Sequence, residues 1–275
     1  MKKIGIEIEF TGITRSQVVT ALENFFQVTA ASIQSKTADD GYYYHKLIDN
    51  NGDTWLVVRD RSIKAEQYAH KVNLDAEDKF ELVPIDGDET EYMVELVTPA
   101  LTSTTLPTLF TIVDIIKALG GVVNSSCGLH IHLDKPDSLD DILTLYNRFY
   151  NEQEFIFTKF NVAACRLNRY CKCYNSFEKF PLSFNTEDEF INYLVTKYAD
   201  TDEFNNLVPR SIRYYALNFW SLKEHGTIEF RLFNSTLDRV EIARIIDWVI
   251  HFVYTTEDYT DYISILGNIT ASELK

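Results

Sequence analysis

The sequence predicts an α+β fold built on a mostly antiparallel sheet. Segments that alternate apolar and polar residues, as half-buried strands do, cluster in pairs joined by short turns. Segments with apolar residues at helical spacing fall between these pairs, without the strict strand–helix alternation of a doubly wound parallel sheet. No internal repeat or evident linker divides the chain, so we expect one domain over residues 1–275.

The first third of the chain contains four predicted strands and one predicted helix. Residues 4–10 alternate apolar side chains with glycine and glutamate, which predicts a strand, and residues 16–26 have helical spacing. Residues 42–59 predict a hairpin that turns at residues 49–52. A further strand is expected over residues 90–98, because alternation continues there until a proline ends it.

The middle of the chain is predominantly helical. Residues 106–119 predict a helix that stops at two glycines, which can adopt the left-handed cap conformation. A short strand is expected over residues 129–133. Two more helices are expected over residues 137–160 and 186–198, and the second opens with a threonine–glutamate capping box.

The last third predicts a second hairpin and a helix. Residues 214–221 and 227–233 have the alternation of two paired strands. Asp238 and Glu241 then form a capping box that opens a final long helix. Two remaining segments are expected to be loops, residues 161–180 and 199–211.

Charge and composition argue against several classes of protein. The 41 acidic and 26 basic residues give a net charge of −15, which disfavours nucleic acid as a partner, since phosphate-backbone surfaces depend on clustered Lys and Arg. No apolar run approaches the length of a membrane span, and the N-terminal segment lacks an apolar signal core. Four unevenly spaced cysteines do not form a disulfide framework. We therefore expect a cytoplasmic protein that binds neither nucleic acid nor membrane.

Four of the predicted strands carry ionisable side chains on one face and apolar side chains on the other. Residues two apart in a strand share a face. The ionisable residues placed in this way are Glu7 with Glu9, Glu95, His130 with His132, and Glu229 with Arg231. A sheet face with several glutamates is unfavourable unless cations neutralise it or water solvates it well. Ligands that are mostly carboxylate with one or two imidazoles suit Mg²⁺ or Mn²⁺ better than Zn²⁺.

Each of these features also has an ordinary structural explanation. Alternating glutamates are, taken alone, more often solvated surface than metal ligands. A Glu229–Arg231 pair by itself is more often a salt-bridged surface pair. The two histidines fit packing as well as ligation. Four such strands in one chain are harder to explain as surface.

Several segments resemble the amidoligases of the glutamine synthetase and glutamate–cysteine ligase superfamily, and they occur in family order over most of the chain. These segments are Gly5-Ile6-Glu7-Ile8-Glu9-Phe10, Asp60-Arg61-Ser62, Glu95-Leu96-Val97-Thr98-Pro99, Gly128-Leu129-His130-Ile131-His132, and Thr227-Ile228-Glu229-Phe230-Arg231-Leu232-Phe233 with Thr236. Arg166 with Tyr170-Cys171, Arg213-Tyr214 and Asn218 are also similar to the family pattern. Arg61 departs from it, because a small residue is expected there.

The resemblance implies both a fold and an activity. The implied fold is an antiparallel sheet that curves around the active site, with helices on the other face, as in the glutamine synthetase catalytic domain. The implied activity is an ATP- and Mg²⁺-dependent ligation: ATP phosphorylates a carboxylate, and an amine then displaces the phosphate. The substrates would be small-molecule or peptide carboxylates and amines.

The resemblance also assigns roles to individual residues. Ligation of Mg²⁺ (or Mn²⁺) falls to Glu7, Glu9, Glu95, His132 and Glu229. Contacts to ATP fall to His130, Arg166, Arg213, Asn218 and Arg231, and catalytic contacts to Asp60, Ser62 and Arg231. His130 and Asn218 equally fit purely structural roles. Neither a P-loop nor a dinucleotide-binding glycine motif occurs, so the adenine pocket has no assigned residues.

Two other functions are compatible with the same residues. A metal-dependent hydrolase would use the cations without a nucleotide. A non-catalytic relative would keep the sheet and bind metal or nucleotide without turnover, and Arg61 is the only feature of the sequence that points to it.

Overall fold

The computed structural model describes residues 2–34, 43–71, 79–167, 169–175, 183–254 and 260–271. Its main sheet has eight strands, and every pairing between neighbours is antiparallel. In spatial order the strands are β11 (Leu217–Asn218), β12 (Thr227–Asn234), β8 (Gly128–Asp134), β1 (Ile4–Phe10), β7 (Val94–Val97), β4 (Thr54–Arg59), β3 (Tyr43–Ile48) and β2 (Ala31–Gln34). The predicted α+β class is confirmed.

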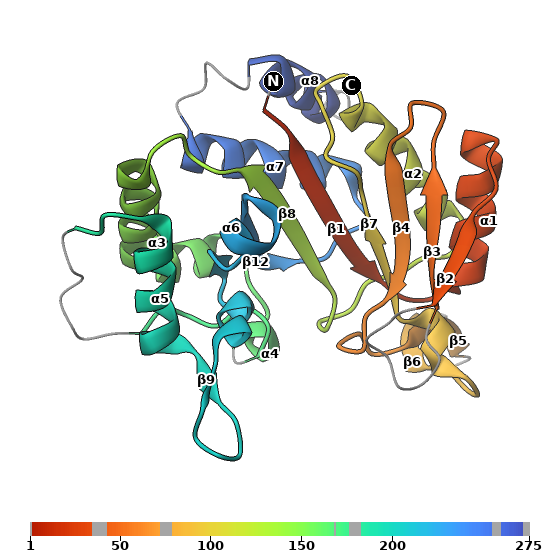
Figure 1. The fold of residues 1–275 in the computed structure, drawn as a ribbon. Coiled ribbons are helices and arrows are strands. Elements are labelled where there is room, and N and C mark those ends of the chain that lie inside the picture. The colour runs from red at the N-terminus through yellow and green to blue at the C-terminus, as the bar shows by residue number, and fades with distance from the viewer. Residues whose placement is uncertain are drawn as a thin grey trace.

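Helices flank this sheet, and α2 and α7 lie behind it in the view of Figure 1. The helices of the described residues are α1 (Arg15–Phe26), α2 (Leu106–Ala118), α3 (Leu139–Lys159), α4 (Ala164–Leu167), α5 (Glu187–Tyr198), α6 (Ser221–His225), α7 (Arg239–Val253) and α8 (Thr260–Ala271). The short helix α6 lies on the viewer's side of β12, opposite α7 (Figure 1). None of the described helices combines the length and apolar character needed to cross a bilayer.

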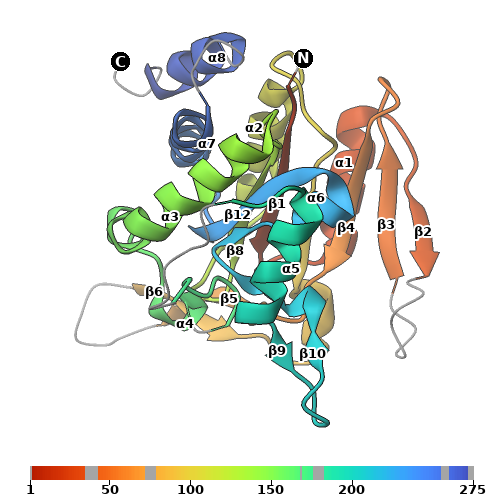
Figure 2. The same cartoon turned by 60° about the vertical axis from the view of Figure 1, so that its left-hand side comes forward.

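Four short strands and two 3₁₀ helices complete the described structure. Two small antiparallel pairs lie outside the main sheet, β5 (Glu66–Lys71) with β6 (Lys79–Pro84) and β9 (Asp200–Thr201) with β10 (Leu207–Val208). Figure 2 shows the β9–β10 hairpin projecting from the end of α5. Two 3₁₀ helices, η1 (Glu89–Tyr92) and η2 (Pro209–Tyr214), precede β7 and β11.

The core lies between the sheet and the helices behind it. Alternate residues of the central strands point into this layer and are at most 1% exposed: Ile4, Ile6, Ile8 and Phe10 of β1, and Leu129, Ile131 and Leu133 of β8. They pack with buried apolar residues of α1, α2, α3 and α7 in one hydrophobic cluster. The intervening residues of β1 and β8 are therefore directed to the opposite face of the sheet.

Asp238 and Thr186 cap their helices as the sequence predicts, but the glutamate of each expected capping box does not complete it. The Asp238 side chain accepts hydrogen bonds from the first turn of α7, while its backbone N–H donates to the Thr236 hydroxyl instead of the Glu241 carboxylate. The Thr186 hydroxyl likewise accepts the backbone N–H of Glu189. The Glu189 carboxylate, however, accepts the backbone N–H of Asn185 rather than that of Thr186, so it reaches one residue beyond the expected capping box.

Two predicted strands are shorter than expected because local side-chain bonds compete with strand pairing. The strand expected over residues 90–98 begins only at β7, since the Asp88 carboxylate accepts the N–H of Thr90 and caps η1. The strand expected over residues 214–221 is reduced to β11. There the Asn218 side chain accepts the N–H of Trp220, which turns the chain into α6.

Other elements were not expected from the sequence. The predicted loop over residues 161–180 contains α4, and the loop over residues 199–211 contains the β9–β10 hairpin and the start of η2. Helix α8 follows α7, so the helix opened by Asp238 is not the last one. Strand β2, whose alternation covers only four residues, and strands β5 and β6 were likewise not expected.

Replacing a core residue of β8 should destabilise the protein far more than replacing an exposed residue of the same type. Ile131 is fully buried, whereas Ile48 at the end of β3 is 50% exposed. We expect Ile131→Ala to lower the free energy of unfolding by about 2–5 kcal/mol, because it leaves a cavity in the core. Ile48→Ala should lower it by less than about 1 kcal/mol. Urea unfolding followed by circular dichroism measures both, and equal losses would contradict the burial described above.

Candidate active site

The ionisable residues of four strands converge on the face of the sheet opposite the core. Strand β1 lies between β7 and β8, and its pairing sets Glu9 directly opposite Glu95 and Glu7 opposite His130. Strand β12 pairs with the other side of β8, and this register sets Glu229 opposite His132. Directly opposed residues of antiparallel strands project from the same face. The strand register therefore gathers all the predicted metal ligands.

These side chains line a cavity of about 550 Å³. The predicted site residues that line it are Glu7, Glu9, Asp60, Ser62, Glu95, His132, Arg213, Asn218, Glu229 and Arg231. His130 and Arg166 do not line it, and each is only 1% exposed. Ten of the twelve predicted site residues thus share one cavity, and the other two lie beneath its floor.

Three overlapping groups of potential metal ligands run across the strands. Within each group the ligand atoms lie within 4.8 Å of one another. The groups are Glu7–His132–Glu229, Glu7–Glu95–His130 and Glu9–Asp60–Glu95. Neighbouring groups share a glutamate, so the carboxylates form one continuous acidic strip from β12 to the end of β4.

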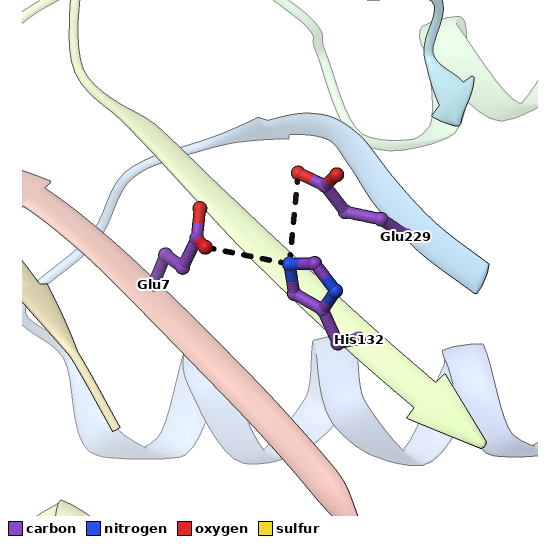
Figure 3. Close-up of side chains that lie close together, drawn as sticks. All are labelled: Glu7, His132 and Glu229. Carbon is purple, nitrogen blue, oxygen red and sulfur yellow. Dashed lines mark ion pairs between the residues drawn. The ribbon is translucent and has the colours of Figure 1, made fainter. Parts of the chain in front are cut away.

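The first group has the donor chemistry of a divalent-cation site. The Nε2 atom of His132 lies 3.4 Å from Oε1 of Glu7 and 3.8 Å from Oε1 of Glu229 (Figure 3). This nitrogen is buried and has no hydrogen-bond partner among the described residues. A buried polar atom without a partner is costly. A cation between the three side chains would remove that cost, so the residues present fit a bound metal.

The other nitrogen of the same imidazole is held by hydroxyl groups. Nδ1 of His132 lies 3.1 Å from the Thr227 hydroxyl and 3.3 Å from the Ser221 hydroxyl. Metal-binding histidines usually use one nitrogen for the metal and donate from the other to a fixed acceptor. Thr227 and Ser221 can orient the ring in this way, with Nε2 facing the two glutamates.

Two of the glutamates are held in the ionised form by neighbouring cationic groups. Burial alone would raise the pKa of Glu7, but the hydrogen bond to His130 and the nearby imidazoles of His130 and His132 outweigh it and hold the pKa well below its usual range. Burial likewise opposes ionisation of Glu229, yet the adjacent Arg231 guanidinium and the histidines lower its pKa. These carboxylates are ready to accept a cation.

The opposite holds for the glutamates nearer β4. Burial and the negative charges of Glu7, Asp60 and Glu9 raise the pKa of Glu95 well above its usual value. Burial also raises the pKa of Glu9. Two unit charges about 5 Å apart repel by roughly 3 kcal/mol at an effective dielectric constant of about 20. A single hydrogen bond, at about 1 kcal/mol net, cannot offset that, so this end of the strip needs a cation to stay ionised.

Five arginines line the same acidic cavity. They are Arg59, Arg61, Arg210, Arg213 and Arg231. The chain has 11 arginines and 15 lysines, yet no lysine of the described segments lines the cavity. Guanidinium groups bind phosphate and carboxylate oxygens in a planar, two-point geometry that lysine cannot reproduce. The composition of the lining therefore favours anionic ligands with paired oxygens.

Arg231 and Asn218 brace Glu229 from two sides. Arg231 donates to one carboxylate oxygen of Glu229, and the Asn218 amide donates to the other at 2.6 Å. Asn218 also accepts the backbone N–H of Trp220. Asn218 thus fixes the Glu229 carboxylate and turns the backbone into α6. These contacts give Asn218 the structural role that the sequence had left as one of two possibilities.

Arg166 and His130 support the floor of the cavity from below. Arg166 donates to the backbone carbonyls of Ser126 and Arg231, and its Nη1 lies 3.9 Å from Oε2 of Glu9. A Cβ atom at Gly128 would lie 2.2 Å from the Arg166 guanidinium, so only glycine fits there. His130 bonds to Glu7 through Nδ1 at 2.9 Å. Neither side chain is placed to contact a ligand in the cavity.

The turn after β4 brings Asp60 and Ser62 to the acidic strip. The Asp60 carboxylate accepts the backbone N–H of Ser62 at 2.6 Å, and the Asp60 carbonyl accepts that of Ile63. This compact turn accommodates Arg61, whose side chain also lines the cavity. The unexpected arginine therefore adds a cation to the site without preventing the turn that presents Asp60.

Several cavity residues were not predicted as site residues. They are Arg59, Arg61, Tyr170, Arg210, Tyr214, Glu224 and His225. Arg210 and Arg213 share one side of η2, because side chains three apart are aligned in a 3₁₀ helix. That spacing was a usable signal, but residues 199–211 were expected to be a loop. Arg59 ends β4 opposite Val94, so alternation alone would place it on the core face, and no signal in the sequence predicted its place in the cavity.

The cysteines contribute no chemistry to this site. Cys127 is fully buried, and burial raises the pKa of its thiol to about 12. Such a thiol is not a nucleophile at neutral pH. No potential metal group of the described residues includes a cysteine.

Comparison with known proteins gives one family and no individual relative. The family model described as "putative amidoligase enzyme" matches residues 1–253. No curated protein and no solved structure matches the chain. The family match spans nearly all of the 275 residues, including every residue of the cavity. The chain therefore belongs to the amidoligase family.

Proposed function

We propose that this amidoligase joins a carboxylate to an amine in a reaction that depends on ATP and Mg²⁺ and passes through an acyl phosphate. One observation carries the proposal: carboxylates and an imidazole from separate strands converge in one cavity that is also lined by five arginines. A site with cation ligands and guanidinium groups side by side suits phosphoryl transfer, in which charge on phosphate oxygens must be neutralised and oriented.

The acidic strip would hold the divalent cations. Glu7, His132 and Glu229 would bind one ion near β12, and Glu9, Glu95 and Asp60 would bind another near β4. Bound Mg²⁺ would supply charge neutralisation and orientation of the nucleotide phosphates. His130 and Arg166 would act beneath the strip by fixing Glu7 and Glu9.

The arginines would hold the phosphate and carboxylate oxygens of the substrates. Six carboxylates and five guanidiniums line the cavity, so their charges nearly cancel before any cation enters. Divalent cations then make the net charge of the cavity positive. This favours a polyanion such as ATP together with a substrate carboxylate, although the whole chain carries a net charge of −15.

The proposed reaction has two steps. An oxygen of the substrate carboxylate attacks the γ-phosphorus of ATP, the bond to the bridging oxygen breaks, and ADP leaves. The amine nitrogen then attacks the acyl carbon, the C–O bond to phosphate breaks, and phosphate leaves. Arg231 would stabilise charge on the transferred phosphoryl group. Asp60 would accept the proton that the amine loses. Ser62, which lies in the same turn after β4 as Asp60, would help to position the amine.

Removing one carboxylate charge from the strip should abolish turnover. We expect Glu7→Gln or Glu229→Gln to reduce ATP turnover by at least about 100-fold, because loss of even an outer-shell partner of a metal costs about 10–100-fold. Phosphate release measured across a panel of acids and amines, with Mg²⁺, tests this. Turnover by the unaltered protein should require an acid and an amine together.

The matched control is Glu154→Gln on the exposed surface of α3, which should leave turnover unchanged. Undiminished turnover in both site variants would refute the assigned site. Mg²⁺-dependent hydrolysis without nucleotide would instead identify a hydrolase. Binding of Mg²⁺ and ATP without any phosphate release would identify a non-catalytic relative.

Glu95 should make the metal-free protein less stable as pH rises. The pKa of Glu95 in the folded protein is raised well above its usual value of 4.5. At a pH between the usual pKa and the raised one, the folded protein therefore holds a proton that the unfolded chain has lost. Stability therefore falls as pH rises through that interval. Glu95→Gln removes this dependence, and we expect the variant to be the more stable protein in EDTA at pH 8.

Mg²⁺ should reverse that order. A cation that binds only the folded state raises its stability, and it should raise the melting temperature of the unaltered protein more than that of Glu95→Gln. Thermal unfolding at pH 5 and pH 8, with EDTA or with Mg²⁺, gives the comparison. A variant that is less stable than the unaltered protein in EDTA at pH 8 would show that Glu95 has a stabilising partner without metal.

A further inference from the structure

The two ends of the cavity are lined by different chemistry. β12 and β4 are separated by β8, β1 and β7 in the sheet (Figure 1). At about 4.8 Å between neighbouring strands, the two ends lie roughly 19 Å apart. The β4 end is lined by Arg59, Asp60, Arg61 and Ser62, none of which is aromatic. The β12 end contains the two tyrosines of the lining.

Tyr170, Arg213 and Tyr214 lie together at the β12 end of the cavity lining, and we call this group the tyrosine wall. The guanidinium carbon of Arg213 lies 4.7 Å from the centre of the Tyr214 ring. Its Nη2 donates to the Tyr214 hydroxyl at 2.6 Å. The rings of Tyr170 and Tyr214 meet edge to face, with centroids 6.4 Å apart. Two phenol rings and one planar cation thus line the same part of the cavity.

The backbone fixes this wall next to the first cation group. The N–H of Lys172 donates to the Tyr214 carbonyl at 2.7 Å, and the N–H of Ala216 donates to the Lys172 carbonyl at 2.9 Å, which ties the two tyrosine segments together. The N–H of Arg231 donates to the Ala216 carbonyl at 2.9 Å. The segments are therefore bonded to β12, the strand that carries Glu229.

We infer that the tyrosine wall is the subsite for the purine base of the nucleotide. This inference rests on the proposed ATP dependence and adds to it a place for the base. Planar bases stack on aromatic rings and on guanidinium planes. A base on the wall would leave the triphosphate beside the cation group formed by Glu7, His132 and Glu229. Arg213 would contribute its flat face to the base instead of acting solely on phosphate.

The same placement assigns the other end of the cavity to the remaining substrates. With the base at the β12 end, the carboxylate and the amine would occupy the end lined by Arg59, Asp60, Arg61 and Ser62. Arg59 and Arg61 then lie where a substrate with a carboxylate would bind, and Asp60 lies beside the amine. The nucleotide and the acceptor would approach the acidic strip from opposite ends.

Two Mg²⁺-bound probes separate base binding from phosphate binding: ATP, and inorganic tripolyphosphate, which has the phosphates without the base. Calorimetry should show that the unaltered protein binds ATP more tightly. Stacking on one aromatic side chain contributes about 1–3 kcal/mol, which is about 5- to 150-fold in affinity. We expect Tyr214→Leu to weaken ATP binding by about that factor and to change tripolyphosphate binding by less than about twofold.

Two further variants serve as controls. Tyr214→Phe keeps the ring and should retain most of the ATP affinity. Tyr68→Leu removes a tyrosine that is 60% exposed on β5 and does not line the cavity, so it should bind both probes normally. Tyr170→Leu provides a second test of the wall in case Tyr214→Leu does not fold, which circular dichroism will show.

A covalent readout does not depend on either substitution. Photolysis of the unaltered protein with 8-azido-ATP and Mg²⁺ should label the peptides that contain Tyr170 or Tyr214. ATP should block this labelling, and tripolyphosphate should block it less well.

Four results would overturn the inference. Equal weakening of both probes by Tyr214→Leu would show that the wall acts on phosphate or on the fold. Labelling confined to the peptide that contains residues 59–62 would place the base at the β4 end. Equal affinity of the unaltered protein for both probes would show that no base subsite exists and would leave the proposed ligase function standing. If the unaltered protein bound neither probe, both the base subsite and the proposed ATP-dependent function would be refuted.

Discussion

Carboxylates on neighbouring strands repel one another, and the register of this sheet directs several of them to one face. The pairing of β1 with β7 puts Glu9 opposite Glu95, and its pairing with β8 puts Glu7 opposite His130. On an ordinary solvated sheet face such charges would be kept apart. Here they remain together because histidines, Arg231 and backbone N–H groups offset part of the repulsion, and the raised pKa of Glu95 marks the part that is left for a cation.

The same alternation of side chains produces both the core and the site. Residues of β1 and β8 that face the helices are almost fully buried, and their neighbours in sequence face the cavity. Because the side-chain period of a strand is two, a shift of one residue in either pairing would send glutamates into the core and isoleucines into the cavity. Burial of the apolar face therefore fixes the register, and the register fixes the distances between the acidic groups.

Regular alternation made much of this arrangement predictable. The strands that carry Glu7, His132 and Glu229 follow a clear period of two, and from that period the shared face of the sheet could be inferred. Alternation does not show how deep a side chain lies. Arg166 and His130 occur in family-like segments, yet they lie under the floor, because Arg166 fills the space left by Gly128 and His130 is enclosed by glutamates. Arg210 and Arg213 depend on a 3₁₀ helix whose sequence resembles a turn, so their shared face was not evident.

The limits of the family match and of the folded unit differ at the C-terminal side. The match ends at residue 253, but α8 continues the structure and packs Tyr262 and Leu266 into the hydrophobic cluster. The Tyr262 hydroxyl lies within hydrogen-bonding distance of two carbonyls, that of Lys2 just before β1 and that of Leu101 between β7 and α2. A fragment cut where the sequence likeness stops would expose the side of α7 that α8 covers and remove the side chain that binds these two carbonyls. Domain limits for expression of this protein are therefore better taken from burial than from homology.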